Sequence, residues 1–227
     1  IVARLVGKGW RHQVCDSLEE ATQYILAFDA QGVPTYYACA AYRERSVEGV
    51  KNGKPIQQVR THKNVRSLRA FWMDLDVKLG VDTAFSSQEE AIDRLVLFCE
   101  ASHLELPMVV SSGFGIHVYW TLTDEINSDQ WKATAAALKA LAHKLEFKAD
   151  PACTSDPARV LRSVGTWNRK VVDQPRPVEL VADADPVEYA HFHAAVLGAL
   201  GRLGVTPPET VKSRESPAER INEKFAV

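Results

Sequence analysis

Two aspartates, Asp74 and Asp76, stand one residue apart at the end of an apolar run that begins at Leu68. Successive side chains of a β-strand point to opposite faces, so a strand here would present both carboxylates on one surface. Two like charges side by side repel each other unless a cation lies between them. Mg²⁺ is held in proteins by one or two carboxylates together with water and substrate phosphates. The pair therefore indicates either a divalent-metal site for phosphate chemistry or two aspartates that end a strand and turn into a loop.

A glycine-containing turn followed by a histidine is the second group of candidate residues. Its members are Ser111, Ser112, Gly113, Gly115 and His117. Glycine lets the backbone approach phosphate oxygens closely, serine offers a hydroxyl and an amide, and a histidine just past the turn can donate a hydrogen bond to a triphosphate. A half-buried histidine with a structural role is the alternative. Position matters more than residue type here, because an antiparallel hairpin can bring His117 beside the aspartate strand.

Acidic residues precede basic ones in a third segment, between residues 150 and 170. They are Asp150, Asp156, Arg159, Arg162 and Lys170. The planar guanidinium group of arginine suits phosphate recognition, and a third carboxylate would complete a two-metal site for phosphoryl transfer. The structural alternative makes Asp156 a helix N-cap followed by Pro157 at the first helical position. We assign that capping role to Asp156 and the metal to Asp150, with Asp156 as the alternative third ligand.

The hydrophobic pattern predicts an α+β fold in which these segments share one sheet. From residue 68 the elements read strand, helix, strand, strand, helix, strand, which is the split βαβ arrangement (βαββαβ) with helices on one face of a mixed or antiparallel sheet. The predicted strands are residues 68–77, 107–111, 116–121 and 159–166, and the helices begin at the caps Ser87 and Ser128. The uncovered sheet face is suited to nucleic-acid binding or to a metal site.

The predicted organisation has four parts: an N-terminal αβ portion with a basic connection (1–67), the core (68–182), a C-terminal helix (183–205) and a polar linker or tail (206–227). In the first part, a capping box at Ser17 predicts a helix that stops near Gly32, and a strand follows over residues 34–42. The connection 43–67 is too long for an ordinary hairpin and is a candidate functional loop. Its many Arg and Lys residues indicate either polyanion binding or a solvated loop.

Composition sets the outer limits of these interpretations. The chain has 227 residues, of which 46% are hydrophobic, so it can bury a sizeable core. No apolar run reaches the roughly 18 to 20 residues that span a bilayer, and the N-terminus lacks the layout of a secretion signal. We therefore expect a soluble, cytoplasmic protein without a membrane partner. Four widely spaced cysteines without a CxxC pair argue against a zinc ribbon and a disulfide framework.

Taken together, the three segments resemble the archaeo-eukaryotic primase (AEP) superfamily, specifically the primase-polymerase (prim-pol) modules of phages, plasmids and CRISPR-associated systems. The apolar strand that ends in Asp-x-Asp matches the family's first motif, and the glycine-containing hairpin through His117 matches its Ser-x-His motif. Ala149-Asp150 matches the third motif, an apolar residue followed by an acid. The run from Asp156 to Lys170 follows a phage pattern, with Val164 where proline is usual.

This resemblance implies an RRM-like catalytic core that makes or extends primers on a single-stranded DNA template. Asp74, Asp76 and Asp150 would hold Mg²⁺ or Mn²⁺. The incoming dNTP or NTP would contact the turn residues Ser111, Ser112, Gly113 and Gly115 together with His117, Arg159, Arg162 and Lys170. The template and primer strands would contact Arg60, Lys63, Arg66 and Phe114. A bacterial, plasmid or phage origin and a helicase or other module beyond the C-terminus are further expectations.

Two alternatives come from other classes of protein. A glycosyltransferase also uses Asp-x-Asp to bind a metal and a nucleotide diphosphate, but it would normally have a parallel, doubly wound sheet. A non-enzymatic RRM-like module reads nucleic acid with aromatic side chains and does not need paired carboxylates on its central strands. Among the aromatic residues of this chain, the turn residue Phe114 is the best candidate for stacking on bases. We expect Trp72 and Tyr119 to lie in the core.

Overall fold

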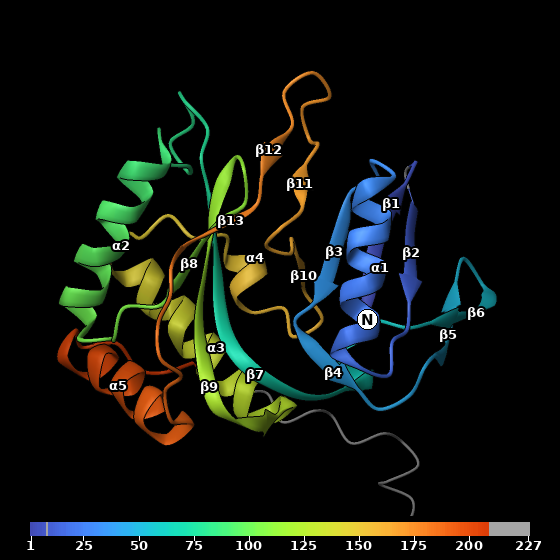
Figure 1. The fold of residues 1–227 in the computed structure, drawn as a ribbon. Helices are drawn as coiled ribbons and strands as arrows, with labels where there is room; N and C mark the ends of the chain where they lie inside the picture. Colours follow the sequence, from blue (N-terminus) through green and yellow to red (C-terminus); the bar gives the residue numbers. More distant parts are fainter. Residues whose placement is uncertain (8, 209–227) are drawn as a thin grey trace, which may run out of the picture.

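The computed structural model describes residues 1–7 and 9–208, and these residues form three layers (Figure 1). Three helices form the first layer, a five-stranded sheet the second, and a smaller sheet with one helix, built mainly from the N-terminal portion, the third. Most of the predicted linker or tail, residues 209–227, lies outside the described residues.

The central sheet has the strand order β13-β8-β9-β7-β4. The bounds of its strands are β4 Ala40–Tyr42, β7 Val65–Asp76, β8 Met108–Ser111, β9 Gly115–Asn127 and β13 Glu179–Ala182. Every neighbouring pair is antiparallel. The α+β class is therefore confirmed, and the sheet is not the parallel, doubly wound type that the glycosyltransferase alternative predicts.

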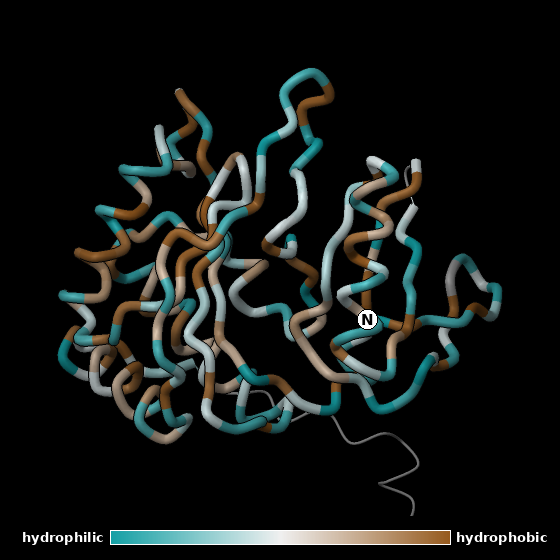
Figure 2. Tube along the Cα trace, viewed as in Figure 1, coloured by the Kyte–Doolittle hydropathy of each residue, from teal (hydrophilic) through white to brown (hydrophobic). Residues whose placement is uncertain are grey.

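Helices α2 (Gln88–Ser102), α3 (Ser128–Lys144) and α5 (Tyr189–Arg202) cover one face of this sheet (Figure 1). The strand residues that face them are large and apolar. Phe71 of β7 stacks on Trp131 of α3, with ring centroids 5.8 Å apart, and on a phenylalanine of α5, at 4.9 Å. Burial of such side chains is the main source of folding free energy. Figure 2 shows apolar segments running through the sheet and its helices.

Capping side chains fix where the helices begin. Ser17 and Ser87 each accept a hydrogen bond of 3.1 Å from the backbone N–H three residues later. They cap α1 (Leu18–Ala30) and α2, as predicted. Helix α3 differs by one position: its cap is Asn127, which forms a capping box, and Ser128 is the first helical residue.

The second sheet has the strand order β10-β3-β1-β2. The bounds of its strands are β1 Val2–Val6, β2 Gly9–Gln13, β3 Thr35–Ala38 and β10 Val160–Leu161. Helix α1 covers one face of this sheet, where Ile25 and Phe28 pack against Val2. We call this unit, β1 to β3 with β10 and α1, the N-terminal layer.

Two predicted strands are divided between the sheets, which corrects the sequence-based assignment. The strand predicted over residues 34–42 is β3 followed by β4, and Cys39 is the point where the chain passes from one sheet to the other. The strand predicted over residues 159–166 shrinks to β10, which pairs with β3 in the N-terminal layer, while β4 takes the edge beside β7. A hydrophobic pattern identifies a strand but not the distant strand with which it pairs.

The predicted connection over residues 43–67 contains regular structure. Strands β5 (Val47–Lys51) and β6 (Lys54–Gln58) form a hairpin, and a 3₁₀ turn, η1 (His62–Asn64), leads into β7. Figure 1 shows this hairpin extending beyond the N-terminal layer. A second hairpin, β11 (Trp167–Asn168) with β12 (Arg176–Pro177), projects near the β8–β9 turn.

Candidate active site

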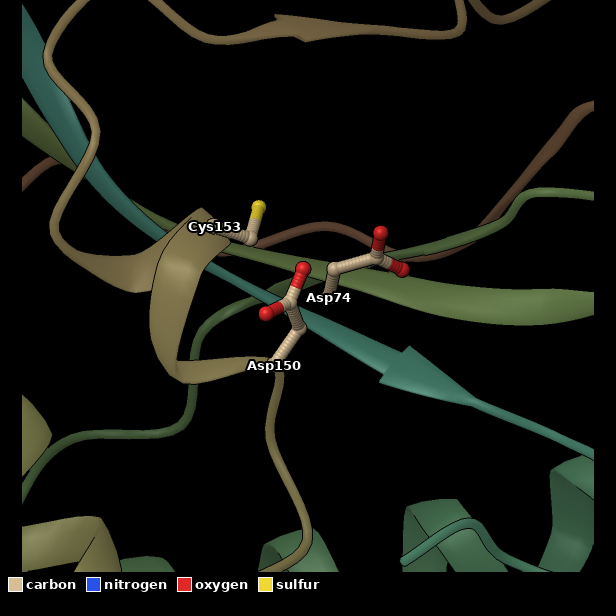
Figure 3. Close-up of side chains that lie close together, drawn as sticks. All are labelled: Asp74, Asp150 and Cys153. Carbon is tan, nitrogen blue, oxygen red and sulfur yellow. The ribbon is translucent and has the colours of Figure 1, made fainter.

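Asp74 and Asp150 come together on the face of the central sheet that the three helices leave free. Asp74 lies on β7, and Asp150 precedes the short helix α4 (Pro151–Thr154). The backbone N–H of Asp150 donates to the carbonyl of Asp74 at 2.9 Å. One ligand atom from each carboxylate and the sulfur of Cys153 all lie within 4.8 Å of one another (Figure 3). The structure thus joins two of the three predicted metal-binding carboxylates.

Local capping explains how Asp150 is positioned. Its side chain accepts a hydrogen bond of 2.8 Å from the N–H of Ala152, and Pro151 occupies the first turn of α4. The indole N–H of Trp72 donates to the carbonyl of Cys153 at 3.1 Å, which ties α4 to β7. The predicted cap with a following proline therefore exists, but at Asp150 and not at Asp156.

Asp156 has a different role from the predicted helix cap. Its carboxylate accepts a hydrogen bond of 2.9 Å from the N–H of Ala158, within a turn, and lies 2.9 Å from Nε2 of His62. Asp156 does not belong to the group formed by Asp74, Asp150 and Cys153. The geometry therefore favours Asp150 over Asp156 as the third carboxylate of the predicted site.

Burial and neighbouring charge make Asp74 unusual. Desolvation, and secondly the charge of Asp76, raise the pKa of Asp74 to about 6, although Arg159 acts in the opposite direction. The guanidinium Nη2 of Arg159 lies 3.6 Å from the Asp74 carboxylate and 3.4 Å from that of Asp150. A positive group thus already lies between the two carboxylates, in the manner expected of a bound cation.

His117 lies beside Asp74 because β7 and β9 pair in the register that sets these two residues opposite each other. Its Nε2 is 3.8 Å from the Asp74 carboxylate, and the residue is only 4% exposed. Desolvation, followed by the charges of Arg162 and Arg159, lowers the pKa of His117 to about 3. His117 is therefore neutral near pH 7, and its contact with Asp74 is polar, not an ion pair.

The site opens into a pocket of about 320 Å³ between the central sheet and the N-terminal layer. Its lining consists of Trp10, Tyr36, Arg60, Asp74, His117, Asp156, Arg159, Val160, Leu161 and Arg162. Three arginines and one strand-borne carboxylate in a single pocket suit a ligand that is both anionic and metal-associated. We call this cavity the carboxylate pocket.

The donor atoms of this site fit a hard divalent cation. Asp74 and Asp150 offer carboxylate oxygens, which Mg²⁺ and Mn²⁺ prefer. Asp76 is exposed two residues after Asp74, on the same face of β7 by strand alternation. Burial raises the pKa of the Cys153 thiol, so its sulfur stays protonated and is a poor ligand for such an ion. The residues present therefore fit an oxygen-coordinated metal.

The predicted turn residues Ser111, Gly113 and Gly115 are not among those that line the carboxylate pocket, whereas His117 lines it. Ser111 lies on the helix side of β8, where its hydroxyl is 3.1 Å from the Gln88 side-chain amide of α2. Gly113 and Gly115 are needed for packing: a Cβ at Gly113 would lie 2.9 Å from Asn168, and one at Gly115 would lie 2.7 Å from a backbone carbonyl. The contact of Ser111, Gly113 and Gly115 with a triphosphate stays a prediction.

Ser112 and Lys170 lie where the β11–β12 hairpin contacts the β8–β9 turn. The buried side chain of Asn168 donates a hydrogen bond of 2.6 Å to the carbonyl of Ser112. It also accepts one of 3.0 Å from the N–H of Lys170, whose side chain is exposed. The run from 165 to 170, matched to a phage motif, thus supports the β8–β9 turn, and Lys170 does not line the carboxylate pocket.

The predicted nucleic-acid contacts fall in separate places. Arg60 lines the carboxylate pocket, whereas Arg66 lines a larger groove of about 910 Å³ between β4, β7 and the N-terminal layer. Lys63 is exposed on η1. Phe114 is half-buried on the β8–β9 turn, with the guanidinium of Arg176 4.4 Å above its ring. Of the four residues, only Arg60 lines the carboxylate pocket, and the contact of the set with nucleic acid stays a prediction.

Some residues of the pocket have no counterpart in the sequence prediction. Trp10 and Tyr36 reach it from the N-terminal layer, and Cys153 of α4, outside the lining, joins Asp74 and Asp150. No local motif marks Trp10 or Tyr36, because only the pairing of β10 with β3 brings their layer to the site. Trp72 and Tyr119 are buried in the core, as expected.

The antiparallel sheet, with helices on one face and the N-terminal layer packed on the other, is an α+β fold that this chain shares with two solved proteins. The AEP domain of the primase-polymerase of cyanophage S-2L has a TM-score of 0.58 at 13% identity, over 86% of this chain and 87% of that domain. Primase RepB′ has a TM-score of 0.53 at 16% identity, over 98% of this chain but only 60% of that protein. The fold predicted from the motifs is therefore confirmed.

Sequence comparisons add no closer relative. No protein-family model matches the chain, and no curated protein gives a significant match.

Within residues 1–7 and 9–208, no helix is both long and apolar enough to cross a membrane.

Proposed function

We propose that this chain is the catalytic module of a template-dependent primase-polymerase, a nucleotidyltransferase that makes or extends primers on single-stranded DNA from dNTPs or NTPs. The convergence of Asp74 and Asp150 beside His117 and Arg159, in a pocket of an AEP-type fold, is the observation that carries this proposal. The antiparallel sheet speaks against the glycosyltransferase alternative, and a desolvated carboxylate such as that of Asp74 is unfavourable in a module that only binds nucleic acid.

Asp74 and Asp150, with Asp76 beside them, would hold Mg²⁺ or Mn²⁺. A divalent ion bound there supplies activation of the primer 3′-hydroxyl and neutralisation of charge on the transferred phosphoryl group. The protein contributes fixed charges around it. Arg159 and Arg162 offer planar guanidinium groups to the triphosphate. His117, being neutral, donates a single hydrogen bond to a phosphate oxygen without adding charge.

An unprimed, template-dependent synthesis assay tests the proposal. Labelled dNTPs and NTPs are compared on single-stranded DNA with Mg²⁺ and with Mn²⁺. We expect incorporation by the wild type and a loss of at least about a thousandfold in Asp74→Asn and Asp150→Asn, because each substitution replaces a charged carboxylate by a neutral amide with one oxygen, a far weaker metal ligand. The control is Asp93→Asn, which changes an exposed acid on α2.

Melting curves accompany the assay, so that loss of activity is separated from loss of fold. Incorporation that persists in Asp74→Asn or Asp150→Asn would contradict the assignment of the two carboxylates. A wild type that binds single-stranded DNA but incorporates no nucleotide under any of these conditions would favour the binding-module alternative.

A further inference from the structure

The wall of the carboxylate pocket that faces Asp74 comes from the N-terminal layer. In that sheet Ala3 is paired with both Tyr36 and His12, and Trp10 lies two residues before His12. Alternation along the strands therefore places Trp10 and Tyr36 on the same face. Val2, which precedes Ala3 on β1, points to the other face and packs against α1. The face with the two aromatic rings is thus the one that α1 leaves free, and it lines the pocket.

The two aromatic rings support each other and carry cations at their sides. Trp10 and Tyr36 meet edge to face, with ring centroids 5.1 Å apart and an interplanar angle of 70°. The guanidinium of Arg162 lies 4.6 Å above the Tyr36 ring, and that of Arg60 lies 5.8 Å from the Trp10 ring. Such contacts orient both the rings and the guanidinium groups.

Two observations indicate that the aromatic side chains of this wall are available to a ligand and do not serve only to pack the two layers together. Trp10 is 41% exposed, although tryptophan is usually well buried, and it is one of the residues that line the pocket. The Nε of Arg60 is buried and has no hydrogen-bond partner within the described residues. The exposed indole and the Arg60 guanidinium beside it line one pocket, and together they are what a planar, polar-edged ring would complement, although the Nε atom itself is covered.

We propose that Trp10, braced by Tyr36, is the stacking platform for the base of the incoming nucleotide, and that Arg60 donates to the edge of this base or to its sugar. This inference rests on the proposed function, because it places the triphosphate at Arg159 and His117, beside Asp74, with Arg162 between them and the aromatic wall. The pocket, at about 320 Å³, is at the lower end of the range of ligand sites and takes one nucleotide better than a strand.

The test compares ligands that do and do not contain a base. Equilibrium binding of a dNTP, of inorganic tripolyphosphate and of a short single-stranded DNA is measured with Mg²⁺ for the wild type, Trp10→Ala and Trp10→Phe. Because stacking of a base on an aromatic side chain is worth about 1–3 kcal/mol, we expect Trp10→Ala to bind the dNTP about tenfold more weakly. Tripolyphosphate binding should stay unchanged, and Trp10→Phe should recover most of the dNTP affinity.

The matched control is Trp167→Ala, which removes an indole exposed to a similar extent, 44%, on the β11–β12 hairpin. A loss for the DNA strand alone would assign Trp10 to the template or primer and overturn the proposal. Unchanged dNTP binding would overturn it as well, and so would an equal loss for the dNTP and for tripolyphosphate, which would mean a damaged site. These binding results do not depend on turnover, so they remain distinct from a failure of the synthesis assay.

Discussion

On one face of strand β7, Phe71, Met73 and Leu75 are fully buried against the helices, whereas on the other face Trp72 is followed by Asp74 and Asp76. The two faces alternate residue by residue along one strand. The helix face gains stability from every apolar group that it buries. The pocket face instead keeps a carboxylate whose pKa is raised to about 6, which is unfavourable for folding near pH 7.

This difference indicates that one face of β7 stabilises the fold while the other carries the candidate functional groups. The packed face holds the backbone of β7 in place, and the rigid backbone then holds the acids in positions that they would not adopt by themselves. Substitutions on the two faces should therefore have opposite consequences for stability and for chemistry.

The largest contrast in stability is expected between Phe71→Ala and Asp74→Asn. Phe71→Ala leaves a cavity between β7, Trp131 and Phe192 and should lower the free energy of unfolding by about 3–5 kcal/mol. Asp74→Asn removes a desolvated charge and should not lower it. Denaturant unfolding of the two variants and the wild type measures the contrast, and an Asp74→Asn variant as unstable as Phe71→Ala would break the comparison.

A smaller loss of stability is expected where the β11–β12 hairpin contacts the β8–β9 turn. Asn168→Ala removes the donor to the Ser112 carbonyl and leaves that buried group without its partner, so the free energy of unfolding should fall by about 1–3 kcal/mol. The control is Gln174→Ala, at an exposed position of the same hairpin. If the two variants unfold alike, the contact at Ser112 contributes nothing to the fold, and the glycine-containing turn is held by other means.

The smallest effect is expected when a positive charge is removed from the pocket face, and it concerns the affinity for a metal ion. Arg159→Gln removes the guanidinium that lies between Asp74 and Asp150, so the free protein should bind Mn²⁺ about tenfold more tightly. The same variant should bind tripolyphosphate more weakly, because a phosphate ligand is lost. Titration followed by Mn²⁺ electron paramagnetic resonance measures the first quantity. Arg66→Gln, near Glu125, is the control, and weaker Mn²⁺ binding by Arg159→Gln would contradict this account.

Local sequence signals predicted much of the fold. The capping serines at positions 17 and 87 begin α1 and α2, and the predicted split βαβ core is present from β7 to α3. These features depend on residues within a few positions of each other, which a pattern of period 2 or 3.6 records directly. The same reasoning indicated that a hairpin could bring His117 beside the aspartate strand, and the structure sets it directly opposite Asp74.

Sequence-based assignments were wrong or incomplete where distant segments had to meet. The cap after the third helix belongs to Asp150 and not to Asp156, β10 joins the N-terminal layer, and Ser111 points toward α2. Each of these outcomes depends on which surface another segment occupies. Short segments such as β10, with two residues, carry too little pattern to specify a partner.

By itself, the sequence determined that two acids share one face of a strand and that a histidine and a pair of arginines lie in segments able to reach them. Only the tertiary structure decided which third carboxylate arrives, that Arg159 lies between the acids, and that Trp10 and Tyr36 close the pocket. Periodicity is a local property of the chain. The groups that surround a desolvated charge come from distant parts of the chain, and long-range packing, which no short stretch of residues encodes, brings them together.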